Sequence, residues 1–156
     1  MTVTRAAEPW MMEPLMRFVS EADARLTLIM TPAGQVLAQY GFTRAVDVMS
    51  AAALGAAIAS STHEIAGILG EGKFKALNHQ GVRQSIFLAE MDNPRGRLLA
   101  LVVFGPETLA GLVQLFFEDL ARDLGQACPH AEPAKPVLSG DFERELNDSL
   151  ASLFGR

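Results

Sequence analysis

The sequence contains one cysteine, Cys128, so the chain cannot form an internal disulfide bond. A small fold held together by disulfides is therefore excluded, and a reducing, cytoplasmic setting is expected. Positive charge is also scarce, because thirteen lysines and arginines stand against eighteen acidic residues, for a net charge of -5. A chain with this balance lacks the basic surface that is typical of nucleic-acid-binding proteins.

Long, strongly apolar runs are missing as well. The uncharged stretch over residues 48–62 consists largely of Ala, Ser and Gly, and it is shorter than the roughly 20 apolar residues that span a bilayer. Glu8 and Glu13 interrupt the segment where a signal peptide would have its apolar core. We therefore expect no membrane insertion. Since 49% of the residues are nevertheless hydrophobic, the apolar excess needs another explanation, and a protein partner is the simplest.

Hydrophobic periodicity predicts both helices and strands. Helical spacing marks residues 8–22, 45–69 and 109–124. Alternation and turn signals mark strands at 25–30, 36–40, 73–79, 82–89 and 97–104. Because hairpins connect successive strands, the expected fold class is α+β, with a five-stranded antiparallel sheet and helices on both faces. This order does not fit a doubly wound nucleotide-binding fold.

The character of the sequence changes after Gly125. Residues 126–138 hold three of the eight prolines, which favours an extended, semi-rigid tether. Residues 139–156 predict an amphipathic helix whose apolar side consists of Phe142, Leu146, Leu150 and Leu153. The expected organisation is a domain over 1–125, a linker over 126–138 and a C-terminal helix over 139–156. That helix either docks on its own domain or binds a partner.

Three motifs resemble catalytic or metal-binding sites, but each lacks a residue that its chemistry requires. Residues 67–74 approach a phosphate-binding loop, but Phe74 stands where a magnesium-binding Ser or Thr belongs. His63-Glu64 begins like a zinc-protease motif, yet Gly67 replaces its second histidine. Cys128 has no neighbouring base to activate its thiol. We expect no catalytic residue, no metal site and no cofactor.

The long helix predicted over 45–69 carries two stripes at helical spacing. The bulky stripe, which we expect to face the sheet, consists of Leu54, Ile58, Ile65 and Leu69. The small stripe consists of Ala53, Ala56, Ala57, Ser60 and Ser61. Small residues on a helix suit either plain packing on a sheet or the close approach of another backbone. Because the bulky stripe already provides a side for the sheet, the second interpretation is favoured.

Several motifs resemble the roadblock/dynein light chain family over roughly residues 8–125. They are LTLIMTPAGQVLA at 26–38 before an Ala-rich helix, LGEGKF at 69–74, HQG at 79–81, LVVF at 101–104 and GLVQL at 111–115. Together with a tethered helix that ends in Leu153-Phe154, they are similar to the MglB-type members, which are partners of the Ras-like polarity GTPase MglA. The resemblance implies a homodimer in which the long second helices pack together and strands 73–79 pair into one continuous sheet.

The same resemblance implies a function without chemistry of its own. Such proteins act as GTPase-activating proteins or scaffolds in cell polarity, and they reshape the switch regions of an MglA-like GTPase without inserting an arginine. When the platform of the family is carried over to this sequence, the resemblance implies that GTPase binding and dimerisation use the small face formed by Ala53, Ala56, Ala57 and Ser60. Glu64 departs from the pattern, since relatives tend to have a small residue there, so its charge either weakens docking or selects a basic partner group.

Two other functions remain open. One is a roadblock scaffold that binds another GTPase, a motor or an adaptor complex without activating hydrolysis. The other is a small-ligand sensor, because α+β folds also build ligand pockets, although the sequence shows no convergent set of polar groups. Whichever partner is bound, Phe142, Leu146, Leu150 and Leu153 are the expected partner contacts of the C-terminal helix.

Overall fold

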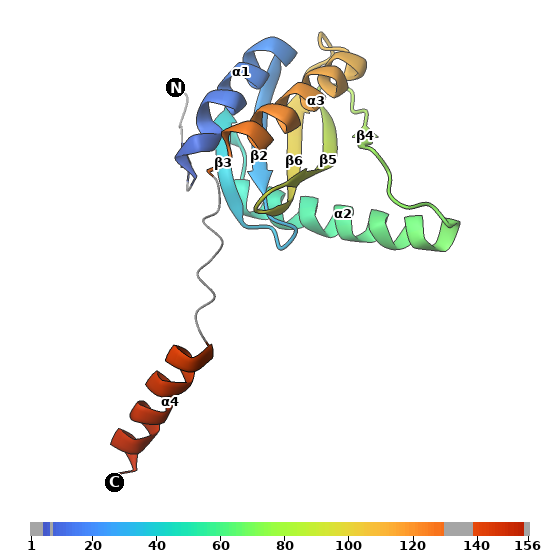
Figure 1. The fold of residues 1–156 in the computed structure, drawn as a ribbon. Coiled ribbons are helices and arrows are strands. Elements are labelled where there is room, and N and C mark those ends of the chain that lie inside the picture. The colour runs from blue at the N-terminus through green and yellow to red at the C-terminus, as the bar shows by residue number, and fades with distance from the viewer. Residues whose placement is uncertain (1–4, 7, 130–138, 155–156) are drawn as a thin grey trace.

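The computed structural model describes residues 5–6, 8–129 and 139–154, which form an α+β fold followed by a C-terminal helix (Figure 1). One antiparallel sheet has the strand order β1-β3-β2-β6-β5-β4. The strands are β1 Arg5–Ala6, β2 Ala24–Met30, β3 Val36–Gly41, β4 Leu77–His79, β5 Ser85–Asn93 and β6 Gly96–Phe104. The α-helices of this described part are α1 Met12–Ala22, α2 Val48–Leu69, α3 Ala110–Ala127 and α4 Ser139–Leu153.

The predicted fold class is confirmed, because the five predicted strands are present and helices cover both faces of the sheet. The two-residue strand β1 was not predicted, and it adds a sixth strand through pairing with β3. Strand β4 covers only the last three residues of the predicted 73–79. β5 and β6 stay paired as far as Asn93 opposite Gly96, so a tight turn at Pro94-Arg95 replaces the longer connection that was predicted.

Each face of the sheet carries its own hydrophobic cluster. On one face, α1 and α3 cover a cluster that includes Ile29, Phe87 and Val102. The ring centroids of Phe87 and Phe117 lie 5.2 Å apart in a tilted arrangement, which joins α3 to the sheet. On the other face, α2 covers a cluster of bulky strand residues, namely Leu26, Leu28, Met30, Leu88, Leu99 and Leu101. Figure 1 shows α1 and α3 on one side of the strands and α2 on the other.

Local signals fix both ends of α2. The Ser50 hydroxyl donates to Asp47 Oδ2 over 2.7 Å, and the Ser50 backbone N–H donates to Asp47 Oδ1 over 3.1 Å. Both hydrogen bonds lower the pKa of Asp47, and the bond from the Ser50 hydroxyl has the larger effect. The contribution of this cap to stability is therefore present at neutral pH and is lost as the pH falls through that lowered pKa. The helix ends at Gly70, whose φ of 72° is left-handed.

Among the described helices, α2 is the one long and apolar enough to cross a membrane by length and composition alone. A helix that covers a sheet in a domain core passes the same test. Ala52 and Ala56 of α2 are buried against the strands, so one side of α2 packs on the sheet.

Candidate functional site

The side of α2 that faces the sheet is made of small residues. Ala52, Gly55 and Ala56 are buried there. A Cβ atom added to Gly55 would lie 3.7 Å from both Leu101 Cδ2 and Met30 Cε, which is ordinary contact distance. Because the strands supply bulky side chains, small residues let the helix backbone lie close above them without voids.

The expectation that the bulky stripe faces the sheet is therefore wrong for most of its members. Leu54 is 65% exposed, Ile65 is 50% exposed, and Leu69 is also exposed. Ile58 alone of the four is partly buried against the sheet-facing cluster. Helical periodicity separates two stripes correctly, but it does not say which stripe points inward. The strand residues already fill the space under α2, so the helix contributes its small side.

The packing of α2 on the sheet buries one residue of the predicted platform and leaves the others exposed. Ala56 is only 7% exposed and belongs to the sheet-facing cluster, so its assignment to a free surface is wrong. The other platform residues are exposed and follow helical spacing along one side of α2: Ala53, Ala57, Ser60 and Glu64. Their contact with a partner stays a prediction. Gly34 in the β2–β3 turn approaches the backbone of α2 closely, since a Cβ on Gly34 would lie 3.2 Å from the Ala53 Cα.

The solvent-facing part of α2 carries exposed polar residues such as Ser50, Ser61 and Glu64 together with large apolar side chains. It exposes five large side chains, those of Met49, Leu54, Ile65, Ile68 and Leu69. Beyond Ala59, Ala66 is the one residue of α2 that is buried, and Figure 1 shows this second half projecting past the strands. Large apolar side chains that are exposed on one helix favour a protein partner there. We call these five residues the α2 outer face.

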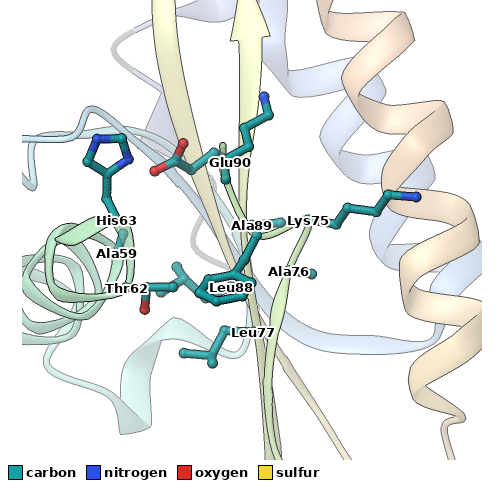
Figure 2. Close-up of a pocket in the computed structure, with 11 residues that line it drawn as sticks. Ala59, Thr62, His63, Lys75, Ala76, Leu77, Leu88, Ala89 and Glu90 are labelled. Atoms are coloured by element: carbon teal, nitrogen blue, oxygen red, sulfur yellow. The ribbon is translucent and has the colours of Figure 1, made fainter. Parts of the chain in front are cut away.

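A small hollow lies between α2, residues 73–76 and the strands β4 and β5 (Figure 2). Thr62 and His63 line it from α2, and Leu77 and Leu88 line it from the strands. Its volume of about 30 Å³ suits one or two water molecules, whereas ligand pockets measure roughly 300–1,000 Å³. This hollow therefore gives no support to a small-ligand sensor. Within the described residues, no group of three or more His, Cys, Asp or Glu side chains is placed to hold a metal ion.

The C-terminal helix α4 has a second apolar stripe that is open to solvent. Leu146, Leu150 and Leu153 are exposed, as is Phe154 directly after the helix. Figure 1 shows α4 apart from the sheet and from the other helices. Phe142 lies within α4, but its side chain is outside those that the structure describes. The predicted helix is present, and its contact with a partner stays a prediction.

Comparison with known proteins agrees with this architecture. The sequence profile of the Roadblock/LC7 domain family matches residues 13–103, which is more than half of the chain. MglB from Myxococcus xanthus is 25% identical with a TM-score of 0.66, over 70% of this chain and 87% of that one. The gliding protein MglB from Thermus thermophilus is 26% identical with a TM-score of 0.68, over 80% of this chain and 93% of that one.

A third MglB structure, described with a tetrameric arrangement, is 26% identical with a TM-score of 0.69, over 80% of this chain and 92% of that one. No curated protein matches the sequence. The chain belongs to the Roadblock/LC7 domain family, and among solved structures it resembles those of MglB.

Proposed function

We propose that the chain is a non-catalytic, cytoplasmic regulator of a Ras-like small GTPase of the MglA type, acting as a homodimeric GTPase-activating protein or scaffold in cell polarity. Its family and its similarity to MglB structures support this function. The observation that carries it is the α2 outer face, which leaves Leu54, Ile65 and Ile68 exposed in the single chain. Exposed apolar side chains of this kind favour a protein partner.

A second copy of the chain is the proposed cover for the α2 outer face. In a two-fold dimer, each copy presents the same stripe to the other, so an apolar stripe is self-complementary. Strand β4 is the last strand of the sheet, and we propose that its outer edge pairs with the β4 of the second copy. The helix contact and the strand contact together extend one sheet across both copies.

The GTPase is proposed to dock beside this dimer contact. Ala53, Ala57 and Ser60 present small side chains there, which permit close approach of a partner backbone. Glu64 stands among them as an exposed carboxylate, and it favours a partner with a basic group at the matching position. The surface is proposed to accelerate hydrolysis by holding the transition-state arrangement of the GTPase more tightly than the resting one.

Two of the three arginines considered as a catalytic finger are already engaged within the chain. Arg95 Nη1 lies 3.0 Å from Glu8 Oε2, and its guanidinium lies 5.9 Å from the centroid of the Trp10 ring. Arg97 Nε lies 3.7 Å from Glu90 Oε2. Arg83 is exposed, and its backbone carbonyl accepts a hydrogen bond from Arg25. These contacts favour structural roles for Arg95 and Arg97.

In a turnover assay with a purified Ras-like GTPase, the wild-type chain is expected to accelerate GTP hydrolysis. Arg83→Ala, Arg95→Ala and Arg97→Ala are each expected to lower that acceleration by less than about tenfold, whereas loss of an arginine finger costs about 10³–10⁵ in rate. The assay is run at saturating concentration of each variant, so that weaker binding is not mistaken for lost catalysis.

A thousandfold loss at one arginine in this assay would establish a finger mechanism and contradict the proposal. Binding without any acceleration would instead favour the second candidate, a roadblock scaffold that binds a GTPase, a motor or an adaptor complex without activating hydrolysis. In that case none of the three arginines has a catalytic role, because the chain would not change the rate of hydrolysis at all.

A further inference from the structure

The second half of α2, residues 60–69, lies outside the core of the domain. Ala66 is the one buried residue among these ten, and Figure 1 shows this half projecting beyond the strands. In the first half, by contrast, Ala52, Gly55 and Ala56 are buried on the sheet. The two halves of α2 are therefore held by different contacts, and the second half has few of them.

The sequence of this second half favours a helix only weakly. Ser61, Thr62 and Gly67 all have lower helix propensity than alanine. The Ser61 hydroxyl donates to the Ala57 carbonyl over 2.9 Å. The Thr62 hydroxyl donates to the Ile58 carbonyl over 2.8 Å, and bonds of this type slightly destabilise a helix. Because a helical segment shorter than about 12 residues is marginal in water on its own, this half depends on packing for its order.

Residues 70–76, which lead from α2 to β4, add little packing. Residues 71–75 are exposed, and residues 72–76 are unpaired with β5. Lys73 Nζ lies 3.4 Å from Asp92 Oδ2, but both side chains are more than half exposed, and such surface ion pairs contribute little stability. The hollow of Figure 2 lies between this segment and the α2 residues Thr62 and His63, so the two segments leave a gap where they face each other.

Backbone hydrogen bonds join residues 70–76 to the end of α2. The Glu71 N–H donates to the Ala66 carbonyl over 2.9 Å, and the Gly70 N–H donates to the Gly67 carbonyl over 3.3 Å. Both acceptors keep these positions only while residues 60–69 are helical. The two segments are therefore expected to open and close together, as local unfolding units do. We call residues 60–76 the α2-end unit.

The α2-end unit carries much of the surface discussed above. Three of the five side chains of the α2 outer face belong to it, namely Ile65, Ile68 and Leu69. Ser60 and Glu64 of the predicted platform belong to it as well. A second copy on the α2 outer face contacts all three apolar side chains only when the unit is closed. Because the second copy binds the closed state better than the open one, it shifts the equilibrium toward the closed state.

We propose that the α2-end unit opens as a whole in the single chain, while the sheet and the first half of α2 stay folded, and that a second copy closes it. The platform is then complete only in the assembled protein. The first statement concerns one chain and is independent of the proposed function. The second statement rests on the dimer proposed above.

Amide hydrogen exchange, followed residue by residue by NMR, tests the opening. The single chain is studied as Leu54→Asp, at a concentration where light scattering gives a monomer, because Leu54 is exposed and lies outside the unit. The protection factors of residues 61–69 are expected to be similar to one another. They are expected to be at least about tenfold lower than those of residues 52–59, which need unfolding of the core to exchange.

Gly67→Ala in the same monomeric background tests whether the unit opens as a whole. A Cβ atom on Gly67 meets no other atom within 4 Å, so the substitution acts through helix propensity. It is expected to raise the protection of all residues 61–69 about fourfold to fivefold. The matched control is Gly125→Ala in α3, where an added Cβ also meets no atom within 4 Å. The control is expected to leave residues 61–69 unchanged.

Equal protection in both halves of α2 would overturn the proposal. Protection that falls off gradually toward Leu69, with Gly67→Ala affecting the last turn alone, would also overturn it, because that pattern is ordinary fraying of a helix end.

The wild-type chain tests the closure by a second copy. As protein concentration rises and the dimer forms, the protection of residues 61–69 is expected to rise at least about tenfold. A dimer that forms without this gain would overturn the second statement. A chain that stays monomeric at every concentration but opens as described would contradict the proposed dimer and leave the first statement intact.

Discussion

Replacing both Leu54 and Ile65 with aspartate is expected to convert the proposed dimer into a folded monomer. Both side chains are at least half exposed in the single chain, so the fold tolerates the change. In a two-fold dimer each substitution occurs twice, and each lost apolar side chain removes about 1.5–3 kcal/mol of burial. The dimer dissociation constant is therefore expected to rise at least about 100-fold.

Light scattering over a range of protein concentrations measures this change. Leu115→Asp is the matched control, because Leu115 is similarly exposed but lies on α3, across the sheet from α2. Circular dichroism establishes that both variants keep their helices. If Leu54→Asp/Ile65→Asp stays dimeric while Leu115→Asp dissociates, the dimer uses the α3 side and the proposed interface is wrong.

Ala56→Arg and Ala57→Arg are expected to fail in different ways although the residues are neighbours. Ala56 is buried in the sheet-facing cluster, so an arginine there overpacks the core and buries a charge. We expect a loss of about 4 kcal/mol or more in the free energy of unfolding. Ala57 is exposed, so the same substitution there costs within about 0.5 kcal/mol but blocks close approach of a partner.

Urea unfolding and a GTPase binding assay separate the two outcomes. Ala56→Arg is expected to unfold at much lower urea concentration, and Ala57→Arg is expected to unfold like wild type but to lose dimerisation or GTPase binding. Equal destabilisation by both substitutions would mean that α2 sits on the sheet with a different face. A stable Ala57→Arg that remains dimeric and binds normally would remove Ala57 from the platform.

The elements that depend on local patterns could be predicted from the sequence. The amphipathic spacing of α1 and α3 and the turn signals between strands are properties of consecutive residues. Strand β1 could not be predicted, because two residues become a strand only through pairing with β3. Residues 73–76 looked like part of β4, but they are unpaired with β5 in the structure.

The orientation of α2 shows a different limit. The sequence contains both a bulky and a small stripe, and burial of the bulky one is the usual expectation for a helix on a sheet. The outcome depends on the strands, which place residues such as Met30 and Leu101 under the helix. The contact of Arg95 with Glu8 and Trp10 is hidden for a similar reason, since these residues meet only after the chain has folded.

The apolar excess of the composition now has a definite location. Part of it is core, but α2, α4 and the outer side of α3 also expose large apolar side chains. Helix α2 packs on a sheet whose last strand is β4. The free edge of β4 suits pairing with a second copy of the chain. The leucine stripe lies at the end of a tether, which suits a contact that forms and breaks.

The mass of the complex with a Ras-like GTPase tests the central claim most directly. The chain is mixed with a GTPase loaded with a non-hydrolysable GTP analogue, and the mass is measured by light scattering during gel filtration. The proposal predicts a species that contains two 16.8 kDa chains and one GTPase. A monomer at micromolar concentration that forms no complex with the GTPase would contradict it.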